Sequence, residues 1–280
     1  MKRVFILLLF FSLILKKAPA QNHSGDTWKK VKNEGSGTLT VAYYEQHGIL
    51  YKDANGTMKG VCADILKDFS DFVKTRYNKN LEIRYAIHEE NFAGFLKIVK
   101  EDATVLGVGN ISITEERKKI YKYTPSYMPN LMVMLTHKDA PNITTFNELK
   151  DKFPGYTAEV INESTSVNMI GKIKKDYSPS LKIRYMESGP AMLESISNDP
   201  KTFGIVDFTE YLNAIRKKIP VKKQNIDLGT SEDLGFLMSK QSDWDEAWNS
   251  FLTPEYKKSS KYRQIIATNL GTSFLNQLNK

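Results

Sequence analysis

The feature that most constrains the fold is a repeated alternation of strand-like and helix-like segments along the chain. In the first series, alternating β-branched or aromatic residues predict strands, and apolar residues at helical spacing predict helices. The expected order is strand 38–44, short strand and turn 49–56, helix 60–77, strand 81–87, helix 92–99 and strand 104–108, with another helix starting after Thr114. Such an order predicts a parallel sheet covered by helices.

A second series follows and shows the same alternation. It comprises strand 156–161, helix 164–175, strand 181–186, helix 190–197, strand 203–207 and helix 208–217. Two such series predict an α/β protein with two lobes, each built on a mixed, mainly parallel sheet.

Two extended segments are expected to cross between the lobes. One runs near 131–141, and the strand-like stretch 233–238 is expected to return to the first lobe before two final helices at 243–252 and 255–270. A hinge with two crossings and a cleft between the lobes follows from this arrangement. The predicted organisation is lobe 1 over 37–134 plus 233–280, and lobe 2 over 135–232.

The first twenty residues have the pattern of a secretory signal peptide. Lys2 and Arg3 precede an apolar run over 4–15, and the segment ends with Ala-Pro-Ala at Ala20. An apolar run of about 12 residues is too short to span a bilayer comfortably, although an uncleaved anchor is the alternative. We expect cleavage after Ala20, a periplasmic or secreted protein, and a flexible polar leader over 21–36.

Charge and cysteine content argue against several classes of protein. The formal net charge is +8, and removal of the leader, which holds four basic residues and no acid, lowers it to +4. Basic residues are mixed with acids, as over 115–119, which is unlike a nucleic-acid-binding stripe. Cys62 is the single cysteine, so no internal disulfide is expected, and we interpret it as a small buried hydrophobe. Dispersed histidines and the lack of His-Glu-x-x-His or Gly-x-Ser-x-Gly motifs predict no metal or cofactor site.

The stretch Asn-Ile-Ser-Ile-Thr-Glu-Glu-Arg, from Asn110 to Arg117, follows a predicted strand and starts a helix. Thr114 is of a residue type that caps helices, and Arg117 then occupies the third helical position. Backbone N–H groups and a guanidinium at one helix start can bind a small anion such as a carboxylate. The segment alone is equally consistent with a capped surface helix carrying an exposed arginine.

With these residues identified, the chain resembles the family 3 extracellular solute-binding proteins, which serve polar amino-acid uptake in bacteria. The likeness spans roughly 37–271. It is carried by Thr-x-x-Arg over 114–117 followed by Tyr-Thr-Pro-Ser-Tyr over 123–127, and by Tyr-Lys-Asp-Ala-Asn-Gly over 51–56, Gly-Val-Cys-Ala-Asp over 60–64 and Gly-Ile-Val-Asp over 204–207. The resemblance implies the two-lobed type II periplasmic binding protein fold, which closes on its ligand.

The resemblance also implies how a ligand carboxylate would be bound. Arg117 matches the arginine that grips the carboxylate as a bidentate pair, and Ser112 matches a hydroxyl position beside it. Ser164 and Thr165 match a helix start that adds backbone N–H donors. Both residues would also be good N-caps whether or not they contact a ligand.

The remaining implied roles concern the ammonium and the walls of the pocket. Asp207 matches the carboxylate that receives the ligand ammonium, although it could simply cap the helix that follows. Phe92 matches an aromatic wall, with Tyr51 or Tyr44 supplying the other, although Phe92 also has the spacing of a core residue. Asn110 stands where the family usually has glycine, so its side chain is expected to crowd or contact the ligand.

Other departures from the family leave the side-chain end of the pocket open. The first loop, over 43–48, looks shorter than usual and lacks the frequent aspartate and the aromatic-proline pair. Glu163 sits where glycine is common. The identity of the ligand is therefore not fixed by the resemblance.

Three kinds of function are compatible with this sequence. The first is a monomeric carrier that captures an amino-acid-like zwitterion and presents it to an ABC-type membrane permease. The second is a ligand-sensing subunit of a signalling receptor. The third is a dehydratase of the same fold, for which Glu45, His47 and Glu163 are the candidate acid or base groups. Without a catalytic motif, binding is preferred over catalysis.

Overall fold

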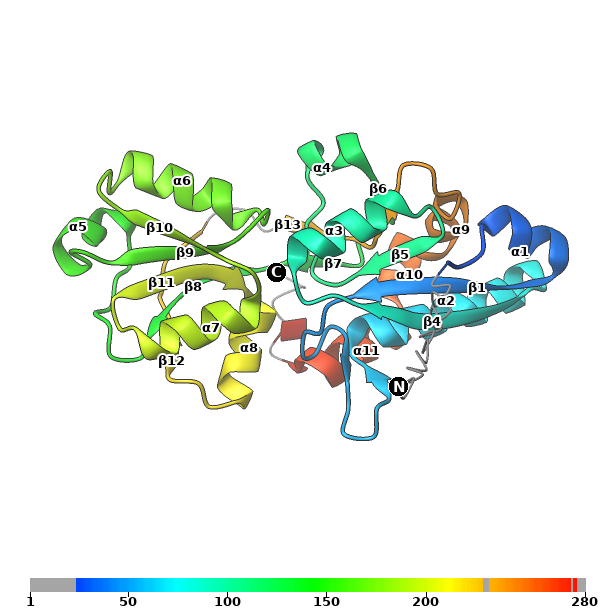
Figure 1. The fold of residues 1–280 in the computed structure, drawn as a ribbon. Coiled ribbons are helices and arrows are strands. Elements are labelled where there is room, and N and C mark those ends of the chain that lie inside the picture. Colours follow the sequence, from blue (N-terminus) through cyan, green and yellow to red (C-terminus); the bar gives the residue numbers. More distant parts are fainter. Residues whose placement is uncertain (1–23, 229–231, 273, 276–280) are drawn as a thin grey trace, which may run out of the picture.

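The computed structural model describes residues 24–228, 232–272 and 274–275. It has two α/β lobes, each built on a five-stranded sheet (Figure 1). The mixed α/β class and the two-lobed architecture expected from the sequence are thereby confirmed. The predicted signal peptide lies outside the described residues, and no helix among the described residues is long and apolar enough to cross a membrane.

The sheet of lobe 1 combines early and late parts of the chain. Its strand order is β4-β1-β5-β14-β6. Strand β1 pairs in parallel with β4 and β5, and β14 pairs in antiparallel with β5 and β6. The strands are β1 (Ser36–Tyr43), β4 (Asn80–His88), β5 (Val105–Val108), β6 (Tyr121–Tyr123) and β14 (Leu237–Ser239), with a small hairpin of β2 (Tyr51–Lys52) and β3 (Met58–Lys59) alongside.

Helices cover both faces of this sheet because apolar side chains of β1 alternate between them. Leu39 and Val41 contribute to the cluster that contains helix α2 (Val61–Tyr77), whereas Ala42 contributes to the cluster that contains α3 (Phe92–Glu101). In α2, fully buried residues recur every four positions, which places them on one face: Val61, Ile65, Phe69 and Val73. Further helices of lobe 1, besides the N-terminal α1 described below, are α4 (Glu115–Ile120), α9 (Asp245–Phe251), α10 (Pro254–Lys258) and α11 (Ser260–Leu270).

The sheet of lobe 2 has the strand order β10-β9-β11-β8-β12. Strands β10, β9 and β11 are parallel, and β8 is antiparallel to its neighbours β11 and β12. The strands are β8 (Met132–His137), β9 (Thr157–Ile161), β10 (Lys182–Met186), β11 (Thr202–Asp207) and β12 (Val221–Lys223). The helices are the 3₁₀ turn η1 (Phe146–Glu148), α5 (Leu149–Lys152), α6 (Ser166–Asp176), α7 (Gly189–Asn198) and α8 (Phe208–Arg216).

The two crossings between the lobes pair with each other. Strand β7 (Met128–Asn130) is antiparallel to β13 (Glu232–Leu234). The first crossing ends earlier than the sequence predicts, because β8 begins at Met132 and already belongs to the sheet of lobe 2. The expected boundary at 134/135 is therefore about three residues late, since the apolar runs on either side of the hinge look alike in sequence.

The expectation of a flexible leader over 21–36 does not hold for its second half. Residues Trp28–Glu34 form helix α1, capped by the Thr27 hydroxyl, and Trp28 is fully buried. The carboxylate of Asp243 accepts hydrogen bonds from the backbone N–H groups of Trp28 and Lys29, both at 2.8 Å, and the Trp28 ring lies 5.3 Å from that of Trp244. A seven-residue helix held by partners more than 200 positions away shows too little periodicity to be predicted.

Candidate ligand-binding site

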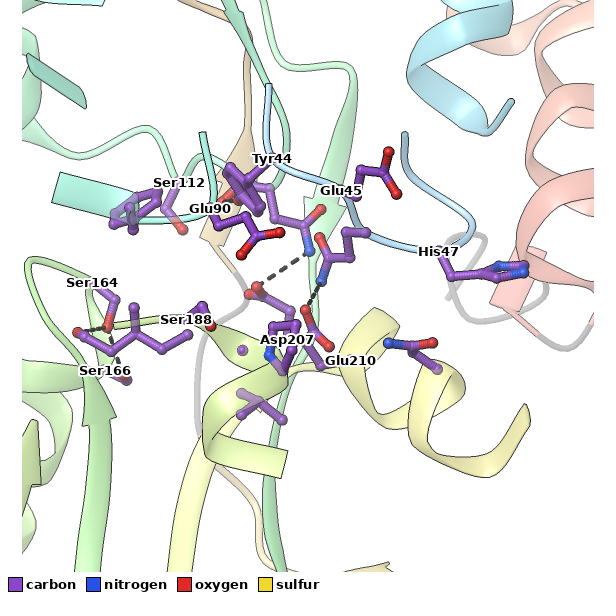
Figure 2. Close-up of a pocket in the computed structure, with 18 of the residues that line it drawn as sticks. Tyr44, Glu45, His47, Glu90, Ser112, Ser164, Ser166, Ser188, Asp207 and Glu210 are labelled. Atoms are coloured by element: carbon purple, nitrogen blue, oxygen red, sulfur yellow. Dashed lines mark hydrogen bonds between the residues drawn. The ribbon is translucent and has the colours of Figure 1, made fainter. Parts of the chain in front are cut away.

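A cleft of about 400 Å³ lies between the lobes, and both lobes contribute to its lining. Several of its residues lie at or just after the carboxyl ends of strands, as is usual for open α/β sheets: Tyr44 after β1, Asn110 after β5, Ser164 after β9 and Asp207 at the end of β11. Figure 2 shows this part of the cleft. The structure brings all nine residues singled out from the sequence to this one cleft: Tyr44, Tyr51, Phe92, Asn110, Ser112, Arg117, Ser164, Thr165 and Asp207.

Arg117 lies at the start of α4, in the geometry expected from the sequence. Thr114 caps the helix, because its hydroxyl accepts a hydrogen bond from the Arg117 N–H at 3.1 Å. The guanidinium donates to the backbone oxygens of Ser112 at 3.2 Å and Glu163 at 2.7 Å, and it lies 5.3 Å from the Phe92 ring centroid. Since Ser112 and Glu163 belong to different lobes, Arg117 is held across the cleft and retains further N–H donors for a ligand.

The backbone conformation of Glu163 is one that favours glycine at this position. Its φ of 61° is in the left-handed region, which glycine adopts without steric cost. Its backbone oxygen, rather than its carboxylate, contacts Arg117. The Glu163 side chain is therefore not positioned as an acid or base by this contact.

Ser112 and Thr165 share a partner that the sequence analysis missed. Both hydroxyls donate to the same carboxylate oxygen, Oε2 of Glu232, and the Thr165 distance is 2.9 Å. Glu232 lies on the second hinge crossing, so this carboxylate joins lobe 1 to lobe 2 at the hydroxyls implied for a ligand carboxylate. A single acidic residue in a three-residue strand does not show, from the sequence alone, that its carboxylate lies between the two lobes.

Asp207 occupies the N-cap position of α8, but its side chain makes no capping hydrogen bond. Its carboxylate instead turns into the cleft, where Oδ2 accepts from Asn110 Nδ2 at 3.2 Å and Oδ1 accepts from Asn130 Nδ2. Burial raises the pKa of Asp207, while the hydrogen bonds from the two asparagines oppose that rise. The side chain of Asn110 thus makes a polar contact with Asp207 that the usual glycine could not make.

Glu210 is a second acid of the cleft that the sequence analysis did not single out. It lies in the first turn of α8, is only 5% exposed, and faces the cleft near Asp207 (Figure 2). Gln46 of lobe 1 donates to Glu210 Oε1 at 2.9 Å and to the Thr209 hydroxyl at 3.0 Å. Burial, followed by the charge of Asp207, raises the pKa of Glu210 to about 7. The spacing of two acids at 207 and 210 was the available signal.

Aromatic side chains form the lobe 1 wall of the cleft. Tyr44 donates its hydroxyl hydrogen bond to the Asn110 backbone oxygen at 3.0 Å and packs edge-on against Phe92, with ring centroids 5.8 Å apart. Tyr51 stacks on His47 at 4.1 Å between centroids, and Arg216 of lobe 2 donates to His47 Nδ1 at 2.6 Å. Burial and the charge of Arg216 lower the pKa of His47.

Metal and thiol chemistry have no candidates in the part of the chain that the structure describes. No group of three or more His, Cys, Asp or Glu residues there could hold a metal ion. Cys62 is fully buried in the core of lobe 1, as expected, and burial raises the pKa of its thiol.

Among the acid–base candidates named from the sequence, Glu45 is exposed at the cleft.

Solved structures share the fold over most of their length. An amino acid ABC transporter substrate-binding protein from Streptococcus pneumoniae bound to L-arginine has a TM-score of 0.66 and 16% identity, covering 86% of this chain and 97% of its own. A putative L-cystine ABC transporter protein from Listeria monocytogenes has a TM-score of 0.69 and 13% identity, covering 84% and 97%. An ancestral amino acid-binding protein described as a precursor of cyclohexadienyl dehydratase has a TM-score of 0.62 and 21% identity, covering 86% and 97%. No match was found among curated proteins.

Two lobes, two hinge crossings and a cleft lined by residues of both lobes define a two-lobed binding-protein fold. Residues 39–272 match the family described as bacterial extracellular solute-binding proteins, family 3, and this chain belongs to that family. Membership implies a periplasmic or secreted protein.

Proposed function

We propose that this protein captures a small amino-acid-like zwitterion between its lobes and presents it to a membrane partner. The observation that carries the proposal is the pair of opposite charges on opposite lobes, Arg117 and Asp207, lining one cleft of about 400 Å³. Structures of similar fold are described as binding proteins for arginine, and related ones as parts of ABC transporters. We propose an ABC-type permease as the partner, with a sensor as the alternative, and a monomer released by cleavage after Ala20.

Binding would proceed by replacing contacts that the chain makes with itself. The ligand carboxylate would dock on the free donors of Arg117 and take the Ser112 and Thr165 hydroxyls from Glu232. The ligand ammonium would take the Asp207 oxygen now contacted by Asn110. Closure of the lobes would remove water from both ion pairs and so strengthen them.

Asp207→Asn tests the ammonium role. Truncating the charge of one partner in a buried, hydrogen-bonded ion pair costs about 2 kcal/mol or more, so we expect the affinity for a bound amino acid to fall roughly 30-fold. Calorimetry against a panel of amino acids measures this loss. Asp176→Asn, an exposed acid at the end of α6, is the matched control and should bind like the parent. An Asp207→Asn variant that binds as tightly as the parent would remove the ammonium from the proposal.

Glu232→Ala tests whether the hinge carboxylate competes with the ligand carboxylate. Without Glu232, the Ser112 and Thr165 hydroxyls need not give up a partner, so we expect the amino-acid affinity to rise roughly tenfold, or about 1.4 kcal/mol. Asp233→Ala is the control, because Asp233 is exposed on the same strand and accepts from Ser126 instead. Equal or weaker binding by Glu232→Ala would show that Glu232 supports the bound state.

A dehydratase-like activity is the second candidate, and Glu210 is the observation that favours it. A general acid works best with a pKa near the working pH, and the pKa of Glu210 is raised to about 7 in the cleft. Incubation with prephenate-like acids, followed by detection of the dehydrated product, separates the candidates. Formation of the dehydrated product by the parent protein, with loss of that activity in Glu210→Gln, would establish the dehydratase function. We favour the carrier because Arg117 and Asp207 account for both poles of a zwitterion without a reaction.

A further inference from the structure

One end of the cleft contains the two acids Asp207 and Glu210, and we call it the acidic end. It has more hydrogen-bond acceptors than donors. Eight buried side-chain atoms among the described residues have no hydrogen-bond partner, and four of them are oxygens of residues that line this cleft. All four residues are at least 94% buried: Gln46, Asn110, Glu210 and Asn213. Buried acceptors without a donor are costly, so their grouping at one end of one cleft marks a place for a donor-rich group.

The orientation of the two lobe 1 amides is fixed by their other contacts. The nitrogen of Gln46 donates to Glu210 and Thr209, and the nitrogen of Asn110 donates to Asp207 and Thr209 at 3.2 and 2.7 Å. With both carboxylates ionised, turning either amide over would bring its oxygen against a carboxylate oxygen, which repels it. Gln46 Oε1 and Asn110 Oδ1 therefore stay as acceptors. Asn213 Oδ1 and, in the ionised form of Glu210, its Oε2 atom are also buried oxygens without a partner.

The two acids at this end of the cleft have no ion-pair partner among the described residues. Asp207 and Glu210 both lie at the start of α8. The basic side chains that line the cleft, Lys52, Arg117 and Lys217, form no salt bridge with either acid. The exposed Lys217, at the far end of the helix, lowers the pKa of Glu210 less than burial and Asp207 raise it. In the facing loop, His47 is engaged by Arg216.

We infer that the ligand carries a second cationic, N–H-rich group, a guanidinium or an ammonium, which binds Glu210 and the amide oxygens of Gln46, Asn110 and Asn213. This inference rests on the proposed function and deepens it, because it names dibasic amino acids as the ligand class. A guanidinium offers five N–H donors and an ammonium three, which suits several acceptors around one carboxylate. A neutral hydroxyl or amide group would supply fewer donors and leave the charge of Glu210 uncompensated.

Matched pairs of probes test this inference. Arginine and citrulline have nearly the same shape but differ in charge at the far end, and lysine and norleucine differ in the same way. We expect the charged member of at least one pair to bind roughly 30-fold tighter by calorimetry at pH 7.5. In Glu210→Gln, which keeps the side-chain volume, that ratio should fall to about threefold or less. Equal affinities within both pairs, or a ratio that survives in Glu210→Gln, would overturn the inference.

Proton release gives a second measurement that needs no variant. Near pH 7 Glu210 carries a proton part of the time, and a bound cation favours its ionised form, so arginine or lysine should release protons and bind more tightly as pH rises from 6 to 8. Calorimetry in two buffers of different ionisation enthalpy counts the protons. The absence of release would count against Glu210 as the cation site. If no amino acid bound at all, the proposed function itself would be wrong, which is distinct from neutral and charged amino acids binding equally.

Discussion

Arg117→Ala is expected to lower the affinity for a bound amino acid at least a hundredfold. Hydrogen bonds to charged groups contribute about 1.5–3 kcal/mol each, so the loss of a bidentate guanidinium–carboxylate pair costs about 3 kcal/mol or more. That energy corresponds to more than a hundredfold in the dissociation constant. The side chain is already held over Phe92 and between the backbone oxygens of Ser112 and Glu163, so little ordering remains to be done on binding.

Two further variants make this expectation specific. Lys118→Ala removes the next basic residue of α4, whose ammonium pairs with the exposed Glu115, and should leave the affinity unchanged. Arg117→Lys keeps the charge but loses the planar fork, so its affinity should lie between those of the parent and Arg117→Ala. Calorimetry with the tightest amino acid from the panel measures all three. If Arg117→Ala bound within about threefold of the parent, the carboxylate of the ligand would lie elsewhere.

Phe69→Ala is expected to lower the free energy of unfolding of lobe 1 by about 3–5 kcal/mol. Phe69 is fully buried on α2 and stacks on Trp248 with 3.8 Å between ring centroids. It also contacts Trp244 and Phe251, at 6.1 and 5.5 Å. Truncation therefore leaves a cavity among rings that are fixed by several other contacts and cannot close around it.

The three tryptophans make this loss measurable in one lobe. Trp28, Trp244 and Trp248, the only tryptophans of the chain, all belong to the core of lobe 1. Urea unfolding followed by tryptophan fluorescence thus reports on lobe 1, whereas far-ultraviolet circular dichroism follows both lobes. Phe72→Ala, at a partly buried site of the same helix, is the control and should cost clearly less. A fluorescence midpoint that moves equally in both variants would contradict the assigned role of Phe69.

Local patterns were sufficient to predict the α/β architecture and the cap at Thr114, because both depend on residues close together in sequence. Helix α1 could not be predicted, since Asp243 and Trp244 stabilise it from the other end of the chain. The same holds for the polar contacts of the cleft. Gln46 and Glu210 are 164 positions apart, and only the folded lobes bring them together. From the sequence alone, an acidic residue in a helix or a short strand cannot be told from a solvent-exposed surface residue, because its partner is distant in sequence.

The Glu232 carboxylate limits how strongly a bound ligand can shift the molecule between its open and closed forms. A ligand shifts an equilibrium between open and closed forms only by the difference in its interaction with the two forms. Part of the bridging between the lobes is supplied by the hinge strand itself, through Ser112 and Thr165. In the proposed binding mode, the ligand carboxylate contributes only the excess over that internal bridge. Under the proposed binding mode, the amino acid at position 232 therefore limits how far a bound ligand can shift the equilibrium between the open and closed forms.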